Sequence, residues 1–243
     1  MFATPVYAAT AENGAEHAGA LFQIFGLEVT SVITTMWGVM LLLAVVSYFA
    51  TRNMKLVPTS RLQTFMEMVL EMIIGFLTQV MGDRAKAKRY LPLLGTFFLL
   101  ILLSNYSGIL PGALHGTKSH INGLQAPTSA LSVTAGFAII VFFATHIYGI
   151  KAKGLGYFKH FIQPIPILLP LNILEEFTKP LSLSLRLYGN IYGEEMVVVG
   201  LFGLVPLLLP LPIQFLGLLF GFIQAFVFTL LAAVYINTAT AGH

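Results

Sequence analysis

Long stretches without any charged side chain alternate with short basic clusters along this chain. The first such stretch covers residues 29–51, and two more cover 91–110 and 127–150. A hydrocarbon core about 30 Å thick is crossed by about 20 helical residues. Each of the three stretches therefore predicts a membrane-spanning helix.

The basic clusters indicate how these helices are oriented. Lys and Arg concentrate in cytoplasmic loops, close to the ends of spanning helices. All of the clusters fall on one side if 29–51 runs inward, 91–110 outward and 127–150 inward. We therefore predict that the N-terminus is outside and the C-terminus cytoplasmic; the clusters are Arg52, Lys55 and Arg61, then Arg84, Lys86, Lys88 and Arg89, then Lys151, Lys153 and Lys159.

Residues 61–83 have a different pattern. Glu67 and Glu71 are spaced as neighbours on one helical face, and apolar side chains occupy the other face. Two acids make a full crossing costly, whereas an amphipathic helix lies stably in the plane of the interface. We predict an interfacial helix here, with packing as its main role.

The last third of the chain predicts two unusually long helices, at 166–205 and 213–237. From Pro170 to Val205 there are 36 residues, or roughly 54 Å of helix at 1.5 Å per residue. A helix longer than the bilayer is thick must tilt, and Pro180 is the expected position of a kink. A Pro-rich corner joins the two helices, so we predict a tilted hairpin.

Composition narrows the class of protein further. Hydrophobic residues make up 57% of the 243 and charged residues only 9%, against about 25% charged in soluble domains. A soluble enzyme and a disordered chain are both excluded, and the absence of cysteine excludes disulfides and thiolate sites. The prediction is an all-α integral membrane protein with about five spanning helices and one interfacial helix. Residues 1–28 form an external N-terminal segment, and 29–243 form a single membrane domain.

The strongest functional signal is a charge inside the membrane. Arg186 lies within an apolar run, and a charge near the bilayer centre costs at least about 2.5–3.5 kcal/mol. Because a guanidinium stays protonated, Arg186 cannot carry protons, but it can present a permanent charge to a mobile acid. At helical spacing, the small or polar residues on its face are Glu175, Lys179, Ser182, Asn190 and Gly193.

Other polar residues of the hairpin are candidates for the same function. Glu195 points to the opposite side of the helix from Arg186, and Glu194 lies about 80° around from it. On the last helix, Gln224 and Tyr235 share a face, and we predict that Gln224 pairs with Arg186 across the hairpin. Glu175 and Glu176 have an alternative interpretation as interfacial acids.

The histidines give a weaker signal. His115, His120 and His146 have no metal-ligand spacing, so we interpret them as loop or packing residues. No metal or cofactor is predicted.

The hairpin resembles subunit a of the F-type rotary ATP synthase. Residues 173–190 (ILEEFTKPLSLSLRLYGN) resemble the family signature around its essential arginine, and 224–228 (QAFVF) through Tyr235 resemble the C-terminal signature. Residues 153–158 (KGLGYF) and 166–171 are similar to plastid and cyanobacterial members, and 58–112 match more loosely. Tyr188 stands where many members have Phe. Gly217 stands where some members have a second ionisable residue.

The resemblance implies an ion-translocating stator subunit without a catalytic site of its own. Arg186 would face the carboxylates of the rotating c-ring, between two offset half-channels. Half-channel residues implied by the resemblance are Glu195, Asn190, Gln224, Glu194, Tyr235, Glu175, Glu176 and Ser182. The implied partners are the c-ring, the peripheral-stalk b subunits and the lipid membrane. Neither a nucleic acid nor a small-molecule substrate beyond the ion is implied.

The host membrane implied is the bacterial plasma membrane, with the thylakoid membrane as the alternative. Two other classes of protein remain open from the residues alone. One is a stand-alone ion channel or secondary transporter, and the other is a structural membrane scaffold in which Arg186 would be replaceable.

Overall fold

The computed structural model describes residues 22–24, 27–52, 60–108, 125–158, 167, 169–202 and 210–241. Most of the predicted external N-terminal segment lies outside the described residues. So do the loop with His115 and His120, Lys159, and the Pro206 part of the predicted corner.

Six long helices dominate the described part of the chain, and the predicted all-α membrane class is confirmed. They are α2 (Ser31–Thr51), α3 (Arg61–Met81), α4 (Arg84–Ser107), α5 (Leu131–Lys153), α7 (Leu169–Phe202) and α8 (Pro210–Thr240). Two short 3-10 helices are η1 (Pro127–Ser129) and η2 (Gly154–Phe158). A small antiparallel hairpin of β1 (Phe22–Ile24) and β2 (Leu27–Val29) precedes α2 and was not predicted.

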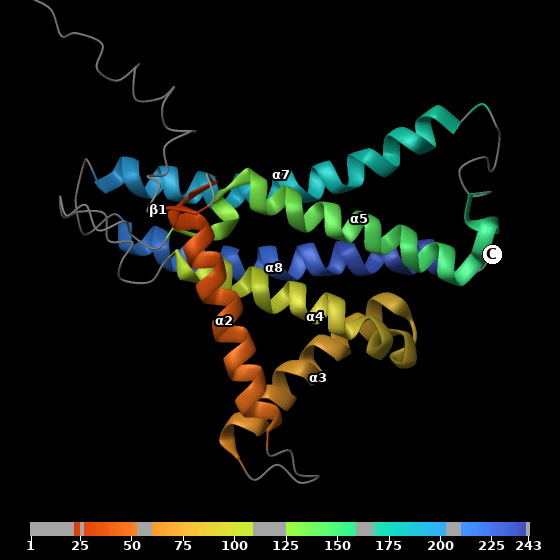
Figure 1. Ribbon diagram of the computed structural model, residues 1–243, viewed down its shortest axis with the longest axis horizontal. Coiled ribbons are helices and arrows are strands. Elements are labelled where there is room, and N and C mark those ends of the chain that lie inside the picture. Colours follow the sequence, from red (N-terminus) through yellow and green to blue (C-terminus); the bar gives the residue numbers. More distant parts are fainter. Residues whose placement is uncertain are drawn as a thin grey trace, which may run out of the picture.

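Four helices form the body of the molecule. Figure 1 shows α4, α5, α7 and α8 running alongside one another, while α2 and α3 diverge from them. The core joins side chains of α3, α4, α5, α7 and α8, and its largest fully buried members include Phe98, Phe228 and Leu187. The long hairpin is therefore held by a packed bundle.

The turn between α3 and α4 is fixed by its two middle residues. Gly82 has a φ of 72°, in the left-handed region that favours glycine. Asp83 then caps α4, its side chain accepting a hydrogen bond from the Ala85 backbone N–H. This cap explains why α4 begins at Arg84, seven residues before the apolar stretch predicted at 91–110.

Five helices of the described chain are long and apolar enough to cross a membrane: α2, α3, α4, α5 and the part of α8 from residue 212. Helix α3 qualifies by length and composition, so its interfacial position stays a prediction. Helix α7 is absent from this set because charged residues interrupt it. Its 34 residues are about 51 Å long, which exceeds the bilayer core.

Candidate functional site

Helices α7 and α8 form the antiparallel hairpin that carries most of the predicted functional residues (Figure 1). Leu183, Leu187 and Ile191 of α7 are buried. A second side of α7 faces outward with large apolar side chains, among them Leu181 and Leu185. The helix therefore packs on α5 and α8 with one side, while a second side is left uncovered by the other described residues.

Arg186 is exposed on α7. In the part of the chain that the structure describes, its guanidinium makes no ion pair and no hydrogen bond. Its neighbours at positions 185 and 187 are both leucine. The chain thus presents a permanent cation on an apolar, uncovered surface.

The prediction that Gln224 pairs with Arg186 is wrong. Gln224 is buried on α8, and its side-chain oxygen accepts a hydrogen bond from the Asn190 amide at 2.6 Å. Asn190 lies one turn beyond Arg186 on α7. This bond satisfies the buried side-chain oxygen of Gln224, and Arg186 takes no part in it.

One polar cluster lies on the C-terminal side of Arg186. Glu194 and Glu195 are both half-buried. The Glu194 carboxylate fills the space beside Gly217 of α8, where any Cβ would collide with its Oε1 atom. The departure from the family pattern at Gly217 thus makes room for an acid on the neighbouring helix.

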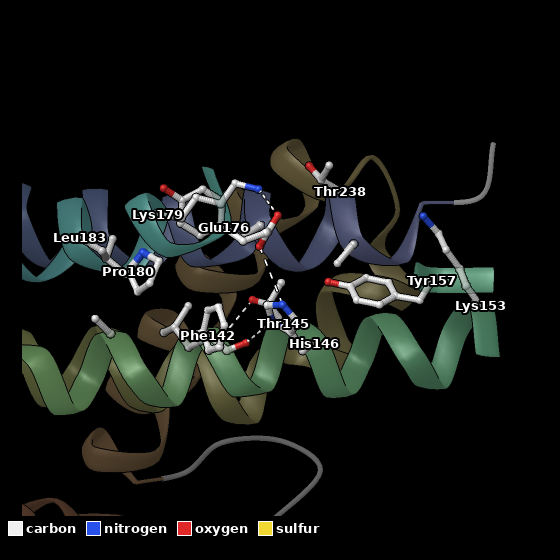
Figure 2. Close-up of a pocket in the computed structure, with 14 residues that line it drawn as sticks. Phe142, Thr145, His146, Lys153, Tyr157, Glu176, Lys179, Pro180, Leu183 and Thr238 are labelled. Carbon is white, nitrogen blue, oxygen red and sulfur yellow. Dashed lines mark hydrogen bonds and ion pairs between the residues drawn. The ribbon is translucent and has the colours of Figure 1, made fainter. Parts of the chain in front are cut away.

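A second polar cluster lies on the N-terminal side of Arg186. Lys179 Nζ is 2.5 Å from Glu176 Oε1 and 3.6 Å from Glu175 Oε1. The same ammonium lies 5.9 Å from the centre of the Tyr235 ring on α8. Glu176 is half-buried, whereas Glu175 is exposed. This cluster borders a pocket between α5, α7, α8 and η2 (Figure 2).

The pocket contains residues that the sequence analysis did not assign to function. His146 of α5 and Tyr157 of η2 line it together with Glu176 and Lys179 (Figure 2). His146 Nε2 is 4.0 Å from Glu176 Oε2. The charge-free pattern of 127–150 offered no signal for this contact, because His146 meets its partner on another helix.

Two serines of α7 lie just before Arg186 in the chain. Ser182, predicted for the half-channels, is half-buried. Ser184, which was not predicted, is buried and shares a hydrogen bond of 3.2 Å with Thr134 of α5. That bond ties the middle of α7 to the bundle, just before Arg186.

The two clusters are well separated along α7. Glu176 is ten residues before Arg186, or about 15 Å, and Glu194 is eight residues after it, or about 12 Å. Arg186 therefore stands between two polar regions that approach it from opposite ends of the hairpin. Among the residues that the structure describes, no group of three or more His, Cys, Asp or Glu side chains is placed to hold a metal ion.

Comparison with known proteins identifies the family. The profile of the family described as ATP synthase A chain matches residues 33–237. The ATP synthase subunit a of Moorella thermoacetica is 44% identical over 224 residues, which cover 92% of this chain and 96% of the relative. The chain belongs to the ATP synthase A chain family, and is thus a proton-translocating membrane subunit without a catalytic site of its own.

Proposed function

We propose that this chain supplies two offset half-channels to the c-ring of a rotary synthase and separates them with Arg186. The observation that carries the proposal is the position of Arg186. It is exposed on the uncovered side of α7, unbound to any acid of the described chain, between two separate polar clusters. The exposed side chains of Leu181 and Leu185 near it would face the lipid or the rotor.

The cluster on the C-terminal side of Arg186 is the proposed outer half-channel. It contains Glu194 and Glu195, with Asn190 and Gln224 at its inner end. Carboxylates in a partly hydrated path can take up protons and pass them on. The amides would orient the groups along this path by hydrogen bonds. A proton leaving this path would neutralise a c-ring carboxylate.

Neutralisation allows the ring carboxylate to enter lipid, because the desolvation penalty of the charged form has gone. After nearly a full turn the same group meets the inner half-channel, formed by Glu175, Glu176, Ser182 and Tyr235. There the fixed charge of Arg186 favours the ionised carboxylate, so the proton leaves. The same charge repels protons that would otherwise pass directly between the half-channels.

The driving force fits a rotor with several sites. One charge crossing 100 mV supplies about 2.3 kcal/mol, so several ions are needed for each ATP. An arginine suits the separating position better than a lysine, because a buried lysine can lose its proton.

The proposed setting is a bacterial plasma membrane, with the N-terminus outside and the C-terminus cytoplasmic. The peripheral-stalk b subunits are the proposed stator partners. The basic clusters at the ends of the helices support this orientation.

The test is Arg186→Ala in the intact complex, with Arg186→Lys as the matched variant that keeps a cation. In inverted membrane vesicles, ATP-driven acidification should be lost in Arg186→Ala, while the passive proton leak rises. Arg186→Lys should keep part of the barrier to leak but pump poorly. Coupled pumping at the wild-type rate in Arg186→Ala would reject the proposed function.

A further inference from the structure

The pocket at the basic end of the bundle is built around a histidine and an acid from different helices. Figure 2 shows His146 on α5 pointing toward Glu176 on α7, with Tyr157 of η2 beside them. The side chain of His146 is only 20% exposed and that of Glu176 only 14%. The pocket lies in the part of the bundle where Lys151 and Lys153 end α5, which we propose to be the cytoplasmic side.

The His146 ring is held in one orientation. Its Nδ1 atom is 2.8 Å from the Phe142 carbonyl oxygen, one turn back on α5. A carbonyl can only accept a hydrogen bond, so Nδ1 carries the hydrogen and Nε2 is the nitrogen that gains or loses a proton. The rings of Phe142 and Tyr157 lie 4.2 Å and 5.7 Å away by their centres. Nε2 is thereby directed at Glu176.

The charged groups that line the pocket with His146 lie on α5 and α7. Glu175 and Glu176 of α7 share one cation, Lys179, and so leave one negative charge in excess at that end of the helix. Tyr235 of α8 and Tyr157 of η2 add only neutral hydroxyl groups to the lining. The second cation, Lys153 of α5, lies beyond the Tyr157 ring from Glu176 in Figure 2.

With Nδ1 protonated, a neutral imidazole presents the lone pair of Nε2 to the lone pairs of the Glu176 carboxylate. Two acceptors facing each other are unfavourable, and one proton between them removes the conflict. The gap of 4.0 Å closes when the carboxylate rotates about its last bond, which is a soft torsion. The pair is therefore suited to receive a proton and pass it on.

We propose that His146 is the last proton-exchanging residue of the inner half-channel, taking protons from Glu176 and passing them to water. In the exit direction, the O–H bond of protonated Glu176 breaks as the N–H bond at Nε2 forms. The products are a carboxylate paired with Lys179 and an imidazolium. The imidazolium then gives its proton to solvent, and the neutral ring is ready for the next one. This inference rests on the proposed function, because it needs a half-channel at this end of the hairpin.

Residue chemistry supports histidine in this position. Histidine is the side chain that ordinarily changes charge between about pH 5 and 8, so it exchanges protons with cytoplasmic water in both directions of operation. The Lys179 ammonium is already engaged by two carboxylates. A purely packing histidine would need only the Phe142 bond and the ring contacts, and would have no reason to direct Nε2 at an acid.

The experiment uses the whole complex in inverted vesicles, whose outer face is the cytoplasmic one. The variant His146→Gln keeps an amide that can bond the Phe142 carbonyl but cannot titrate. Positioned proton-transfer groups typically contribute roughly 10²- to 10⁴-fold; because water partly replaces the ring, we expect about a tenfold slower ATP-driven acidification. The ratio of variant to wild-type rate should be lowest at an outer pH of 8 and should rise toward pH 6, because a higher hydronium concentration allows Glu176 to be loaded directly, without the histidine.

Phe142→Leu is the matched control, since it changes the packing of the ring without removing a titrating group. Its rate ratio to wild type should stay flat with pH. If His146→Gln does not assemble, His146→Asn takes its place, because this shorter amide also cannot carry the exchanged proton and should give the same pH-dependent loss.

Wild-type rates at every pH in an assembled His146→Gln complex would overturn the inference, as would a flat ratio in that variant or an equal pH dependence in Phe142→Leu. Arg186→Ala, measured beside these variants, separates the two proposals. If Arg186→Ala stops pumping while His146→Gln has no effect, only the role of His146 is rejected. If Arg186→Ala pumps normally, the proposed function itself is rejected.

Discussion

At the scale of single residues, the contact between Glu194 and Gly217 leaves no space for a larger side chain at position 217. We predict that Gly217→Ala slows proton pumping, because the new methyl group collides with the Glu194 carboxylate and displaces it. A misplacement of about 1 Å in a reacting group can lower a rate by up to ~100-fold. ATP-driven acidification in vesicles measures the effect. Gly136→Ala on α5, where nothing lies within 4 Å of the new Cβ, is the control and should pump normally.

The same contact predicts a partial rescue. Replacing Glu194 by Asp in the Gly217→Ala background shortens the acid by one methylene and should restore part of the rate. No recovery in the double variant, together with a normal rate in Glu194→Gln, would show that Glu194 lies off the proton path.

Tyr157 offers a residue-scale prediction about pH. Burial raises the pKa of the Tyr157 hydroxyl to about 12, and the nearby Glu176 carboxylate adds to the effect. The unfolded chain then loses this proton near pH 10 while the folded chain retains it. The stability from Tyr157 is therefore fully present below pH 10 and is lost as the pH rises toward about 12.

Thermal unfolding of the detergent-solubilised complex between pH 9 and 12 measures this loss. Relative to Tyr157→Phe, the wild type should lose stability across that window, since phenylalanine has no proton to retain. Parallel pH curves for the two proteins would contradict the prediction. Gly149 supports the same packing, because a Cβ there would press on the Tyr157 ring.

At the scale of elements, the position of α3 has two alternatives: it lies along the membrane interface, or it crosses the bilayer. Its buried face includes Ile73 and Leu77, which pack into the core, while Glu71 pairs with Arg84 at the start of α4. Both partners of that ion pair are exposed, so the pair contributes at most about 1 kcal/mol. An interfacial α3 would keep these charges in water.

The chain has no cysteine, so single cysteines report position without background. We predict that Glu67→Cys and Glu71→Cys react rapidly with a membrane-impermeant maleimide from the cytoplasmic side, because an interfacial helix exposes that face to water. Phe143→Cys, on the exposed apolar surface of α5, should stay unreactive as a lipid-facing control. Protection of both acidic positions would mean that α3 crosses the bilayer.

The helices could be predicted from sequence because their signal is local. A charge-free run such as 127–150 predicts a spanning helix once its length is compared with the thickness of the bilayer. The helix found there is Leu131–Lys153. Asn190 and Gln224 were both selected as functional, but their bond to each other was missed, since the pairing depends on the register of two helices across a gap. The contact between His146 and Glu176 was missed for the same reason, since Glu176 lies thirty residues away on another helix.

At the scale of the whole molecule, the uncovered side of the hairpin predicts permanent association. Exposed apolar residues continue from α7 onto α8, including Phe215, Leu219 and Phe220, and Arg186 stands among those of α7. A stand-alone channel or transporter would be expected to bury its central charge within its own bundle, as intramembrane charges generally face a protein interior or a water-filled cavity. We predict that another subunit supplies that interior here.

Native electrophoresis of mildly solubilised membranes distinguishes these classes. We predict that this chain of 26.5 kDa migrates with a complex many times its own mass, together with a ring-forming partner that carries a membrane carboxylate. Arg186→Ala should keep this migration, because the cation serves transport rather than assembly. In contrast, Leu185→Glu, which places an acid next to Arg186 on the same uncovered surface, should release the chain by adding a desolvation penalty at the interface. Migration of the wild type as a small oligomer would instead favour a self-contained transporter, in which Arg186 must face water or another copy of the chain.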